Sequence, residues 1–517
     1  MHTQKERSGL YELTDAARAE LTDSKYYNND LAPTSLSKRS WNTYHISSLW
    51  ICMSVCLPAF ALASSLVALG LSPWLSVLNV VIGNLIVLVP LLLNAHPGTK
   101  YGIPFPVFSR MTFGAIGAHV PALLRAITAC GWNALQSWIG AAAIVSMVSS
   151  FAPSFQDIPQ IRIICFIVFL ILVCWIASGG STAIKIFEAI SAPILIMLSF
   201  GLFLWSLLFV HSGGAEGISY SFNDVIRTAA NEDLIKSNGG FWFVFLGGLS
   251  GNIAFWAIMA LSIPDFSRYA ISQRAQIRGL LYGMPMAMAV CAFIGAFFAQ
   301  ATFLVGITDV NGNPVFDPTE ILHHLSSPFA TFIVSVGVVI ATITTNVAAH
   351  VVASANAFSN LSPKRINYAA GVIISCVIAV VFQPWHVLDS ADGYIFSWLN
   401  VLGGILAPVA AIFIADYHLV KKRNLDVMAL YQGHEGRYWY QNGWNIRALL
   451  SWVCGWVFPM LGNTVMKDSE VFTWISANGY FVGFLIGLSV YTLLMKSETS
   501  SLVSEEVSKK LTVHDHL

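Results

Sequence analysis

The residues of this sequence with the clearest chemical potential are those that interrupt its long apolar segments. In the first segment, Pro58 removes a backbone N–H near the middle and leaves carbonyl groups one turn earlier without a helical partner. In the sixth, the run 247–252 (Gly-Gly-Leu-Ser-Gly-Asn) precedes Phe255 and Trp256. Helix breaks of this kind expose backbone groups that can bind ions or small polar molecules. Pro and Gly are also common in ordinary membrane helices, so these residues alone do not distinguish a binding site from an ordinary membrane-spanning helix.

Motifs and side chains typical of enzymes are scarce. The sequence contains no phosphate-binding P-loop, no HExxH zinc helix, no GxSxG nucleophile and no paired CxxC motif. Glu188 and Asp265 lie near the ends of apolar segments rather than at mid-depth, which does not favour a proton relay through buried carboxylates. Cys52 and Cys56 are spaced like metal ligands, but no His or acid accompanies them within their segment. We therefore expect neither an enzyme nor a bound cofactor.

The composition indicates an integral membrane protein. Of the 517 residues, 56% are hydrophobic and only 10% are charged, whereas soluble domains contain about 25% charged residues. Lipid must therefore cover most of the surface. Because positive and negative charges balance, the sequence shows no basic face for nucleic acid. The expected partners are the lipid bilayer and a small molecule.

Twelve apolar segments can cross the membrane, because about 20 helical residues span a hydrocarbon core of about 30 Å. Their approximate ranges are 46–70, 74–95, 117–150, 160–179, 184–211, 240–263, 279–305, 327–358, 366–383, 393–418, 446–465 and 472–495. No cleavable signal peptide precedes them, and the first 44 residues are polar. The basic residues that fall in predicted outer segments are Arg162, Arg227, Lys236 and Lys467. The positive-inside rule thus predicts cytoplasmic N- and C-termini in a cell (plasma or inner) membrane.

Several motifs between about residues 39 and 423 carry the most specific signal. They are 94–110 (NAHPGTKYGIPFPVFSR), 113–117 (FGAIG), 121–126 (PALLRA), 131–138 (GWNALQSW), 255–256 (FW), 264–269 (PDFSRY), 344–346 (TTN), 415–417 (ADY) and 420–423 (VKKR). Together they resemble the nucleobase:cation symporter-1 family, in its allantoin, uracil and hydantoin permease branch. The resemblance weakens after the last motif.

The resemblance implies an all-α polytopic membrane protein with 12 transmembrane helices. Ten form a five-plus-five inverted repeat (LeuT-like), and two extra helices follow at the C-terminus. Helices one and six open the two halves of such a repeat, which agrees with the positions of the two breaks. We expect a cytoplasmic tail at 1–44, a transport core at 45–418, a loop with helices 11 and 12 at 419–496, and a C-terminal tail at 497–517. Short disordered ends are expected at roughly 1–35 and 497–517.

The same resemblance implies a substrate site for a flat ring. Its expected residues are Trp132 and Trp256 above and below the ring, Gln136 at its edge, and Phe255, His350 and Cys56 around them. The chemistry fits, since stacking on an aromatic ring contributes about 1–3 kcal/mol per base and a carboxamide both donates and accepts. Trp132 and Gln136 are four residues apart and share a helical face. Without the resemblance, Trp132 would be interpreted as a packing residue among sixteen Trp.

Two expected site positions depart from the family pattern. His350 stands where relatives commonly have Asn, and Cys56 stands where several have Gln or Asn. An imidazole can donate and accept a hydrogen bond, so His350 can still bind the ligand. The alternative is a packing residue whose ring is bonded to a backbone carbonyl. The identity of the heterocycle therefore stays open.

The resemblance also places a coupling cation between helices one and eight. The expected ligands are the carbonyls of Cys52, Val55 and Ala341 and the hydroxyls of Thr344 and Thr345. Such oxygen atoms suit Na⁺. Thr hydroxyls also commonly bond to their own helix backbone, and H⁺ remains the alternative ion.

The function implied is secondary active import of a small planar neutral heterocycle by symport with Na⁺ or H⁺, by a monomer. One alternative is a membrane receptor or sensor that binds the same ligands without transport. A channel is the other, although broken helices and an aromatic site suit an occluded ligand better than a pore.

Overall fold

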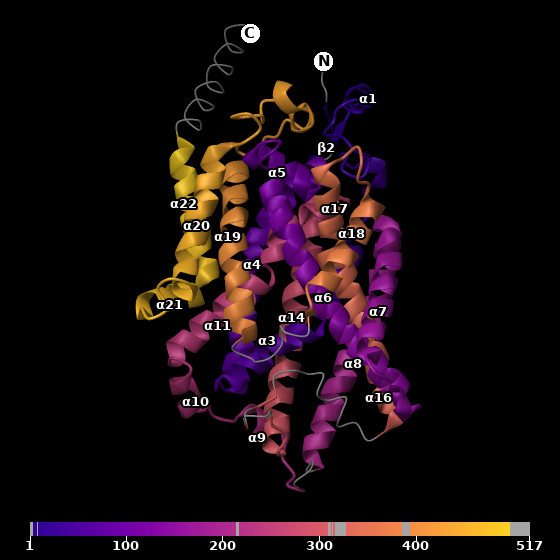
Figure 1. Cartoon of the computed structure of the whole chain (residues 1–517), viewed down its shortest axis with the longest axis vertical. Helices are drawn as coiled ribbons and strands as arrows, with labels where there is room; N and C mark the ends of the chain where they lie inside the picture. Colours follow the sequence, from indigo (N-terminus) through magenta and orange to yellow (C-terminus); the bar gives the residue numbers. More distant parts are fainter. Residues whose placement is uncertain are drawn as a thin grey trace.

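The computed structural model describes residues 4–7, 9–212, 217–308, 312, 314–315, 327–384 and 393–496. Most of them are helical, and most helices run along the long axis of the molecule (Figure 1). The strands β1 (Gln4–Arg7) and β2 (Leu10–Leu13) form a small antiparallel hairpin. We call the end with this hairpin and α1 (Asp15–Leu21) the tail face. The opposite end, with α9 (Phe222–Ile226) and α10 (Glu232–Ser237), is the loop face (Figure 1).

The remaining α-helices and π-helices divide into three groups along the chain. The first group is α2 (Thr43–Ser54), α3 (Leu57–Ala68), α4 (Pro73–Tyr101), α5 (Phe105–Phe113), α6 (His119–Ser149), α7 (Ile161–Ser178) and α8 (Gly180–His211). The second is α11 (Phe241–Phe255), α12 (Ala257–Ser262), α13 (Pro264–Ser267), α14 (Gln273–Leu304), α16 (Pro328–Thr345), η4 (Asn346–Val351), α17 (Val352–Leu361), α18 (Tyr368–Val381), η6 (Gly393–Leu399), α19 (Asn400–Ile414) and η7 (Ala415–Val420). The third is α20 (Ile446–Met460), α21 (Glu470–Ala477) and α22 (Gly479–Leu494), which pack beside α19.

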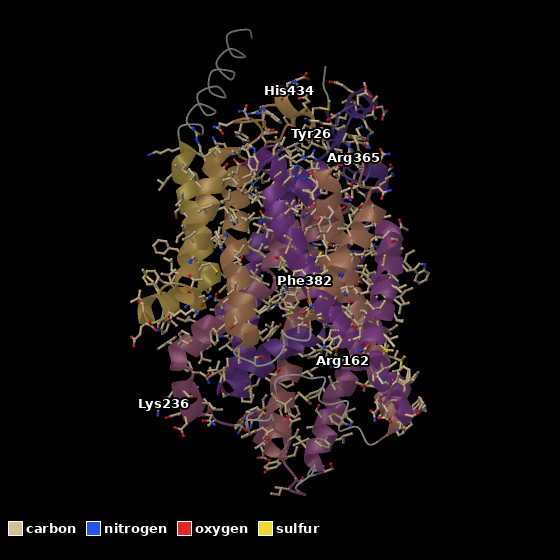
Figure 2. The ribbon with its side chains drawn as sticks, viewed as in Figure 1. Tyr26, Arg162, Lys236, Arg365, Phe382 and His434 are labelled. Carbon is tan, nitrogen blue, oxygen red and sulfur yellow. The ribbon has the colours of Figure 1, made fainter. Side chains whose placement is uncertain are left out.

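The membrane-spanning character predicted from composition is confirmed. In the described ranges, 7 helices are long and apolar enough to cross a membrane, or up to 9 if two bent pairs each count as one span. All twelve predicted ranges fall largely on helices. The count of twelve spans stays a prediction. Arg162 and Lys236, predicted to lie on the outer side, lie toward the loop face, and Arg365, predicted to lie on the inner side, lies at the tail face (Figure 2).

The first helix break is present where the sequence indicated it. α2 ends at Ser54, α3 begins at Leu57, and the two helices are bent by 51°. Between them Cys56 is extended, with φ −143° and ψ 157°. Pro58 occupies the first turn of α3, where its missing N–H leaves no helical bond unmade. The break therefore lies just before the proline.

The second break lies further along than the glycine run suggested. α11 continues through the glycines to Phe255, and the chain breaks at Trp256, which has φ −94° and ψ 0°. Within α11, a Cβ on Gly248 would lie 2.5 Å from the Leu66 side chain, and one on Gly247 2.5 Å from Phe396. Here the glycines allow close helix packing and do not interrupt the helix.

The predicted disorder of 1–35 is wrong for residues 9–35, which are ordered and packed, while the predicted disorder of 497–517 lies outside the described residues. Leu13, Leu21 and Leu31 are buried. The buried Arg39 guanidinium donates to the carbonyls of Thr34 at 3.1 Å and Thr99 at 2.9 Å, which ties the segment to the end of α4. Burial lowers the pKa of Arg39 to about 10. Residues 9–42 thus cover the helix ends at the tail face.

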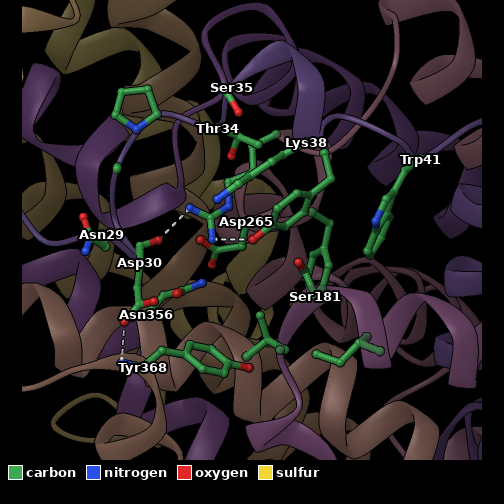
Figure 3. A pocket seen from close by; sticks show the side chains of 18 of the residues that line it. Asn29, Asp30, Thr34, Ser35, Lys38, Trp41, Ser181, Asp265, Asn356 and Tyr368 are labelled. Atoms are coloured by element: carbon green, nitrogen blue, oxygen red, sulfur yellow. Dashed lines mark hydrogen bonds between the residues drawn. The ribbon is translucent and has the colours of Figure 1, made fainter. Parts of the chain in front are cut away.

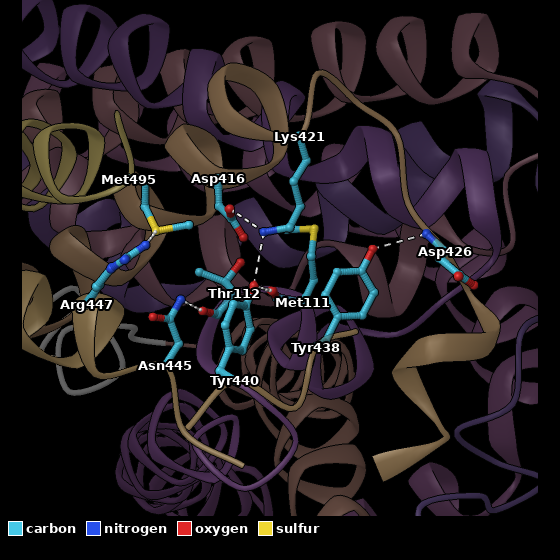
Figure 4. A network of polar contacts seen from close by, with 10 residues as sticks. All are labelled: Met111, Thr112, Asp416, Lys421, Asp426, Tyr438, Tyr440, Asn445, Arg447 and Met495. Carbon is cyan, nitrogen blue, oxygen red and sulfur yellow. Dashed lines mark hydrogen bonds and ion pairs between the residues drawn. The ribbon is translucent and has the colours of Figure 1, made fainter. Parts of the chain in front are cut away.

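A buried ion pair fixes the segment that follows α19. Lys421 pairs with Asp416 of η7, and its ammonium also donates to the Tyr440 hydroxyl at 3.2 Å (Figure 4). Tyr440 in turn donates to the Met111 carbonyl at 2.7 Å. The network therefore connects the end of the α19 helix to α5. Because both charges are buried, loss of either partner alone would leave an uncompensated charge in this network.

Candidate functional site

A small central cavity lies where α2, α6, η4 and the α11–α12 break meet. It encloses about 20 Å³, room for about one water molecule. Its lining residues are Met53, Trp132, Gln136, Phe255, Trp256, Ile258, Met259, Thr345, Ala349 and His350. Five of the six predicted substrate residues are among them. The sixth, Cys56, lies behind the cavity, where its thiol faces Gln136 and Thr345.

Trp132 is positioned by aromatic neighbours on three sides. The His350 ring lies parallel to its indole, with centroids 5.8 Å apart and planes 8° from parallel. Phe255 and Trp398 approach edge-on, at 5.8 Å and 5.7 Å. The indole is buried, so it offers an apolar face with a fixed orientation to a ligand.

Trp256 occupies the second helix break and has its own anchor. Its indole N–H donates to the buried Asn84 side chain of α4 at 2.8 Å. Trp50 of α2 packs against it with centroids 5.3 Å apart and an interplanar angle of 61°. The two tryptophans thus reach one cavity from different helices. Asn84 was not predicted, because a lone Asn in an apolar segment carries no specific signal.

His350 lies on the π-helix η4, and its ring lines the central cavity. Asn346, at the start of η4, donates to the Ser137 hydroxyl at 2.9 Å. This bond connects η4 to α6, the helix that carries Trp132. The Ala349 backbone is a hydrogen-bond partner of the His350 ring, so a packing histidine bonded to a backbone carbonyl remains the alternative for this residue. Among the described residues, Oε1 of Gln136 makes no hydrogen bond. Buried polar atoms usually have partners, so the Gln136 carboxamide is suited to bind a ligand.

The five predicted cation ligands gather at one joint between α2 and α16. The Thr345 hydroxyl donates to the Cys52 carbonyl at 3.0 Å, and the Thr344 hydroxyl to the Ala341 carbonyl at 2.9 Å. Val55 and Ala341 line one further cavity beside this joint. The Thr344 hydroxyl thus bonds the backbone of its own helix, which was the alternative to cation binding noted from the sequence. The carbonyl and hydroxyl oxygens nevertheless suit a hard cation such as Na⁺.

Arg125 lies seven residues before Trp132 on α6 and joins two elements of the cavity wall, a role that the sequence did not reveal. Its fully buried guanidinium donates to the Ser262 hydroxyl at 2.9 Å and to the Ala349 carbonyl at 2.6 Å. Ser262 ends α12, and Ala349 precedes His350 in η4. One side chain of α6 thus joins both elements. Its position in the motif 121–126, one of those that resemble the permease family, was the available signal, but a basic residue near a segment end is ordinarily a topology signal.

Comparison with known proteins places this geometry in a family. The family model described as "Permease for cytosine/purines, uracil, thiamine, allantoin" matches residues 33–487. The chain belongs to this permease family. It is therefore a membrane transport protein and not an enzyme, as predicted.

Individual relatives agree with the family model. This permease is 38% identical over 488 residues to the purine-uracil permease NCS1 of Arabidopsis thaliana, covering 92% of this chain and 78% of the relative. It is 33% identical to the allantoin permease of Bacillus subtilis, covering 91% and 93%. Its fold matches Mhp1, a nucleobase-cation-symport-1 family transporter solved in a closed conformation with bromovinylhydantoin bound. The TM-score is 0.72 at 22% identity, covering 92% of this chain and 96% of Mhp1. That match supports the predicted LeuT-like helical fold.

Proposed function

We propose that this permease imports a small planar neutral heterocycle, a nucleobase, hydantoin or allantoin, together with Na⁺ or H⁺. The observation that carries the proposal is the central cavity, where two indoles and the Gln136 carboxamide face the same space. Stacking on an indole recognises the ring face, and the carboxamide recognises an edge of N–H and C=O groups. The names of the relatives, purine-uracil permease and allantoin permease, support the same ligand class.

Transport requires the cavity to open, because its present volume of about 20 Å³ is too small for a heterocycle. The two helix breaks are the natural hinges. They lie at Val55 and Cys56 and at Trp256, and each separates two short helices that can tilt independently. On the tail-face side, opening requires Arg125 to release Ser262 or Ala349. Alternating access then follows from moving these half-helices around a ligand held near mid-membrane.

Coupling to a cation follows from residues shared by the two sites. Thr345 lines the substrate cavity and bonds the Cys52 carbonyl at the joint between α2 and α16. A cation bound by the carbonyls of Cys52, Val55 and Ala341 and the hydroxyls of Thr344 and Thr345 would hold these helices together. The bound cation would thereby also fix Thr345 in the wall of the substrate cavity. Binding of each solute would thereby strengthen binding of the other.

We further propose that the tail face is cytoplasmic and that the permease works as a monomer in the plasma or inner membrane. The orientation rests on the enrichment of Lys and Arg in the segments assigned to that face. Residues 45–418 form the transport core, and α20 to α22 within 419–496 support it from one side. The segment 1–44 belongs to the cytoplasmic face.

An uptake assay tests the proposed function. Cells that produce the permease are given radiolabelled uracil, allantoin or hydantoin, with choline in place of sodium, or a protonophore, as the two ion controls. We expect saturable uptake of at least one compound above that of empty-vector cells. Saturable binding without uptake would identify a receptor, and conductance without saturation would identify a channel.

Thr345→Ala should raise the sodium concentration for half-maximal uptake several-fold, because it removes one oxygen ligand. By reciprocity, substrate affinity at fixed sodium should fall as well. Thr342→Ala is the matched control, since that hydroxyl bonds only Val338 and Val339 of its own helix in the described structure. If choline leaves uptake intact while a protonophore abolishes it, the coupling ion is H⁺ and this expectation is wrong.

His350→Asn should change the rank order of competing heterocycles, because a carboxamide presents its donor and acceptor in a different geometry from an imidazole. Competition of unlabelled uracil, allantoin and hydantoin against a labelled substrate measures the order. His119→Asn serves as control, since His119 lies outside the cavity near Asn360. An unchanged order combined with lower thermal stability would assign His350 to the scaffold.

A further inference from the structure

A second, larger cavity lies on the tail-face side of the central one. It encloses about 300 Å³, at the lower end of the range for small-molecule sites, about 300–1,000 Å³. The N-terminal segment covers it, and the ends of α8, α13, α17 and α18 form its walls (Figure 3). Its residues therefore come from five distant parts of the chain.

The walls of this cavity carry buried polar atoms that lack partners. Among the residues that the structure describes, no hydrogen bond reaches Nε of Arg268 or the Tyr368 hydroxyl. The Asp265 and Asn356 side chains partner each other, and Asp265 also accepts from the Phe105 N–H at 3.1 Å. Asp265 and Asn356 are 0% and 1% exposed. Their side chains, with that of Tyr368, appear together in Figure 3. Since buried polar groups are nearly always hydrogen-bonded, the two unpartnered groups point to a solute that bonds them.

The chemistry of these groups selects a neutral, flat, amide-like solute. Asn356 and Tyr368 can each donate and accept. The charges of the lining come close to balance, with Arg268, Arg18 and Lys38 against Asp265 and Asp30, and Arg18 also lies 4.0 Å from Glu12. Burial raises the pKa of Asp265 to about 7, although Arg268, the Phe105 N–H, Arg125 and the Asn356 side chain act in the opposite direction. Near neutral pH this carboxyl can therefore accept a hydrogen bond as the anion or donate one as the acid.

Aromatic side chains complete the resemblance to the central site. Trp41 stacks on Tyr269 with centroids 5.5 Å apart and planes 27° from parallel, and both line the cavity. Phe266 lies against the same indole at 6.4 Å. A ring that enters the cavity would thus meet π faces as well as polar edges, the combination that suits a heterocycle.

The two cavities lie in series on the same elements. α13 follows α12 and α17 follows η4, so both walls of the central cavity continue into the second. Asn356 is six residues beyond His350, which corresponds to about 9 Å along a helix. Arg125 lies at the boundary, where it bonds Ser262 on one wall and Ala349 on the other.

We propose that the second cavity is a binding site for the same planar neutral heterocycle, on its route between the central cavity and the tail face. The inference rests on the proposed function. Release then takes two steps. The ligand leaves the central site beside Trp132 when Arg125 breaks its hydrogen bond to Ser262 or Ala349. It then binds next to Asp265 and Asn356 before it reaches the solvent.

Cysteine protection tests the second site directly. Ser181 lines the cavity and is half-buried, so Ser181→Cys provides a reporter that a water-soluble maleimide can reach. The native exposed cysteine, Cys454, is first replaced by Ser. The Trp132→Ala and Gln136→Ala substitutions are made in the same protein to weaken ligand binding at the central site. Any remaining protection of Ser181→Cys from the maleimide then comes from ligand bound elsewhere. The probes are uracil and allantoin, each at a concentration that saturates uptake by the protein with Trp132 and Gln136 intact.

We expect one of the probes to slow labelling of Ser181→Cys several-fold. The neighbouring exposed position, Thr182→Cys, does not line the cavity and should be labelled at an unchanged rate. Adding Asn356→Ala should remove the protection. Tyr368→Phe, which keeps the ring and deletes only the hydroxyl, should weaken it and gives a second variant if Asn356→Ala does not fold.

Three results would overturn the second site while leaving the proposed function intact. They are absence of protection by either probe, equal protection at Thr182→Cys, and protection that persists in both the Asn356→Ala and Tyr368→Phe variants. Failure of the proposed function gives a different result, since the protein with Trp132 and Gln136 intact would then take up neither probe.

Discussion

Trp132→Ala is expected to weaken binding of the transported heterocycle by about 1–3 kcal/mol, the contribution of one stacking contact. The reason lies in the geometry of the central cavity, where the indole is buried and held by His350, Phe255 and Trp398. Trp132→Phe should retain part of the affinity, because stacking requires a π face more than an indole N–H. Equilibrium binding of the labelled substrate to purified protein measures the effect.

The control for this substitution is Trp138→Ala on the same helix. Trp138 packs against Phe166 and Arg162 and does not line the central cavity. Its truncation should leave the affinity within about twofold, as expected for a residue outside the binding site. If Trp132→Ala protein binds as tightly as the parent at normal thermal stability, Trp132 does not belong to the site.

Arg125→Met should open the tail-face side of the central cavity. It removes the hydrogen bonds to Ser262 and Ala349, and a bond from a charged group contributes about 1.5–3 kcal/mol. Even one such bond corresponds to a change of about tenfold or more in the closed-to-open ratio. We therefore expect gradient-driven uptake to fall at least about tenfold, because a cavity that stays open to one side cannot alternate.

The opening can be measured apart from transport. Ile258→Cys places a thiol in the wall of the central cavity, and its labelling from the tail-face side should be faster with Arg125→Met than with Arg125. Arg125→Lys keeps the charge and should give an intermediate rate. An unchanged labelling rate together with normal uptake would show that Arg125 is not the barrier.

Much of the fold could be predicted, because the bilayer imposes a strong pattern on sequence. Apolar segments of the required length became helices, and Pro58 marked the first break correctly. The second break was misplaced, since the glycines of 247–251 looked like an interruption. They lie inside α11, where they let Leu66 and Phe396 approach. The actual break, at Trp256, carries no Pro or Gly that could have marked it in the sequence.

The central site was largely predicted because its residues fall in motifs that resemble a known family. What sequence reasoning missed depends on tertiary contacts. Arg125 looked like one more basic residue near a segment end, and only the structure shows it bonded to Ser262 and Ala349. The N-terminal segment was taken as disordered, since its few buried leucines are too sparse to predict packing. The second cavity combines five segments and leaves no pattern in any one of them.

The central claim, cation-coupled transport of a planar heterocycle, is tested most directly with purified protein in sealed liposomes. Labelled uracil or allantoin is added outside, with an inward gradient of either Na⁺ or H⁺ and with an ionophore as control. We predict that one compound accumulates inside above its external concentration under one of the gradients and returns to equilibrium when the ionophore is added. Uptake that never exceeds the external concentration under either gradient, or binding without any uptake, would contradict the account.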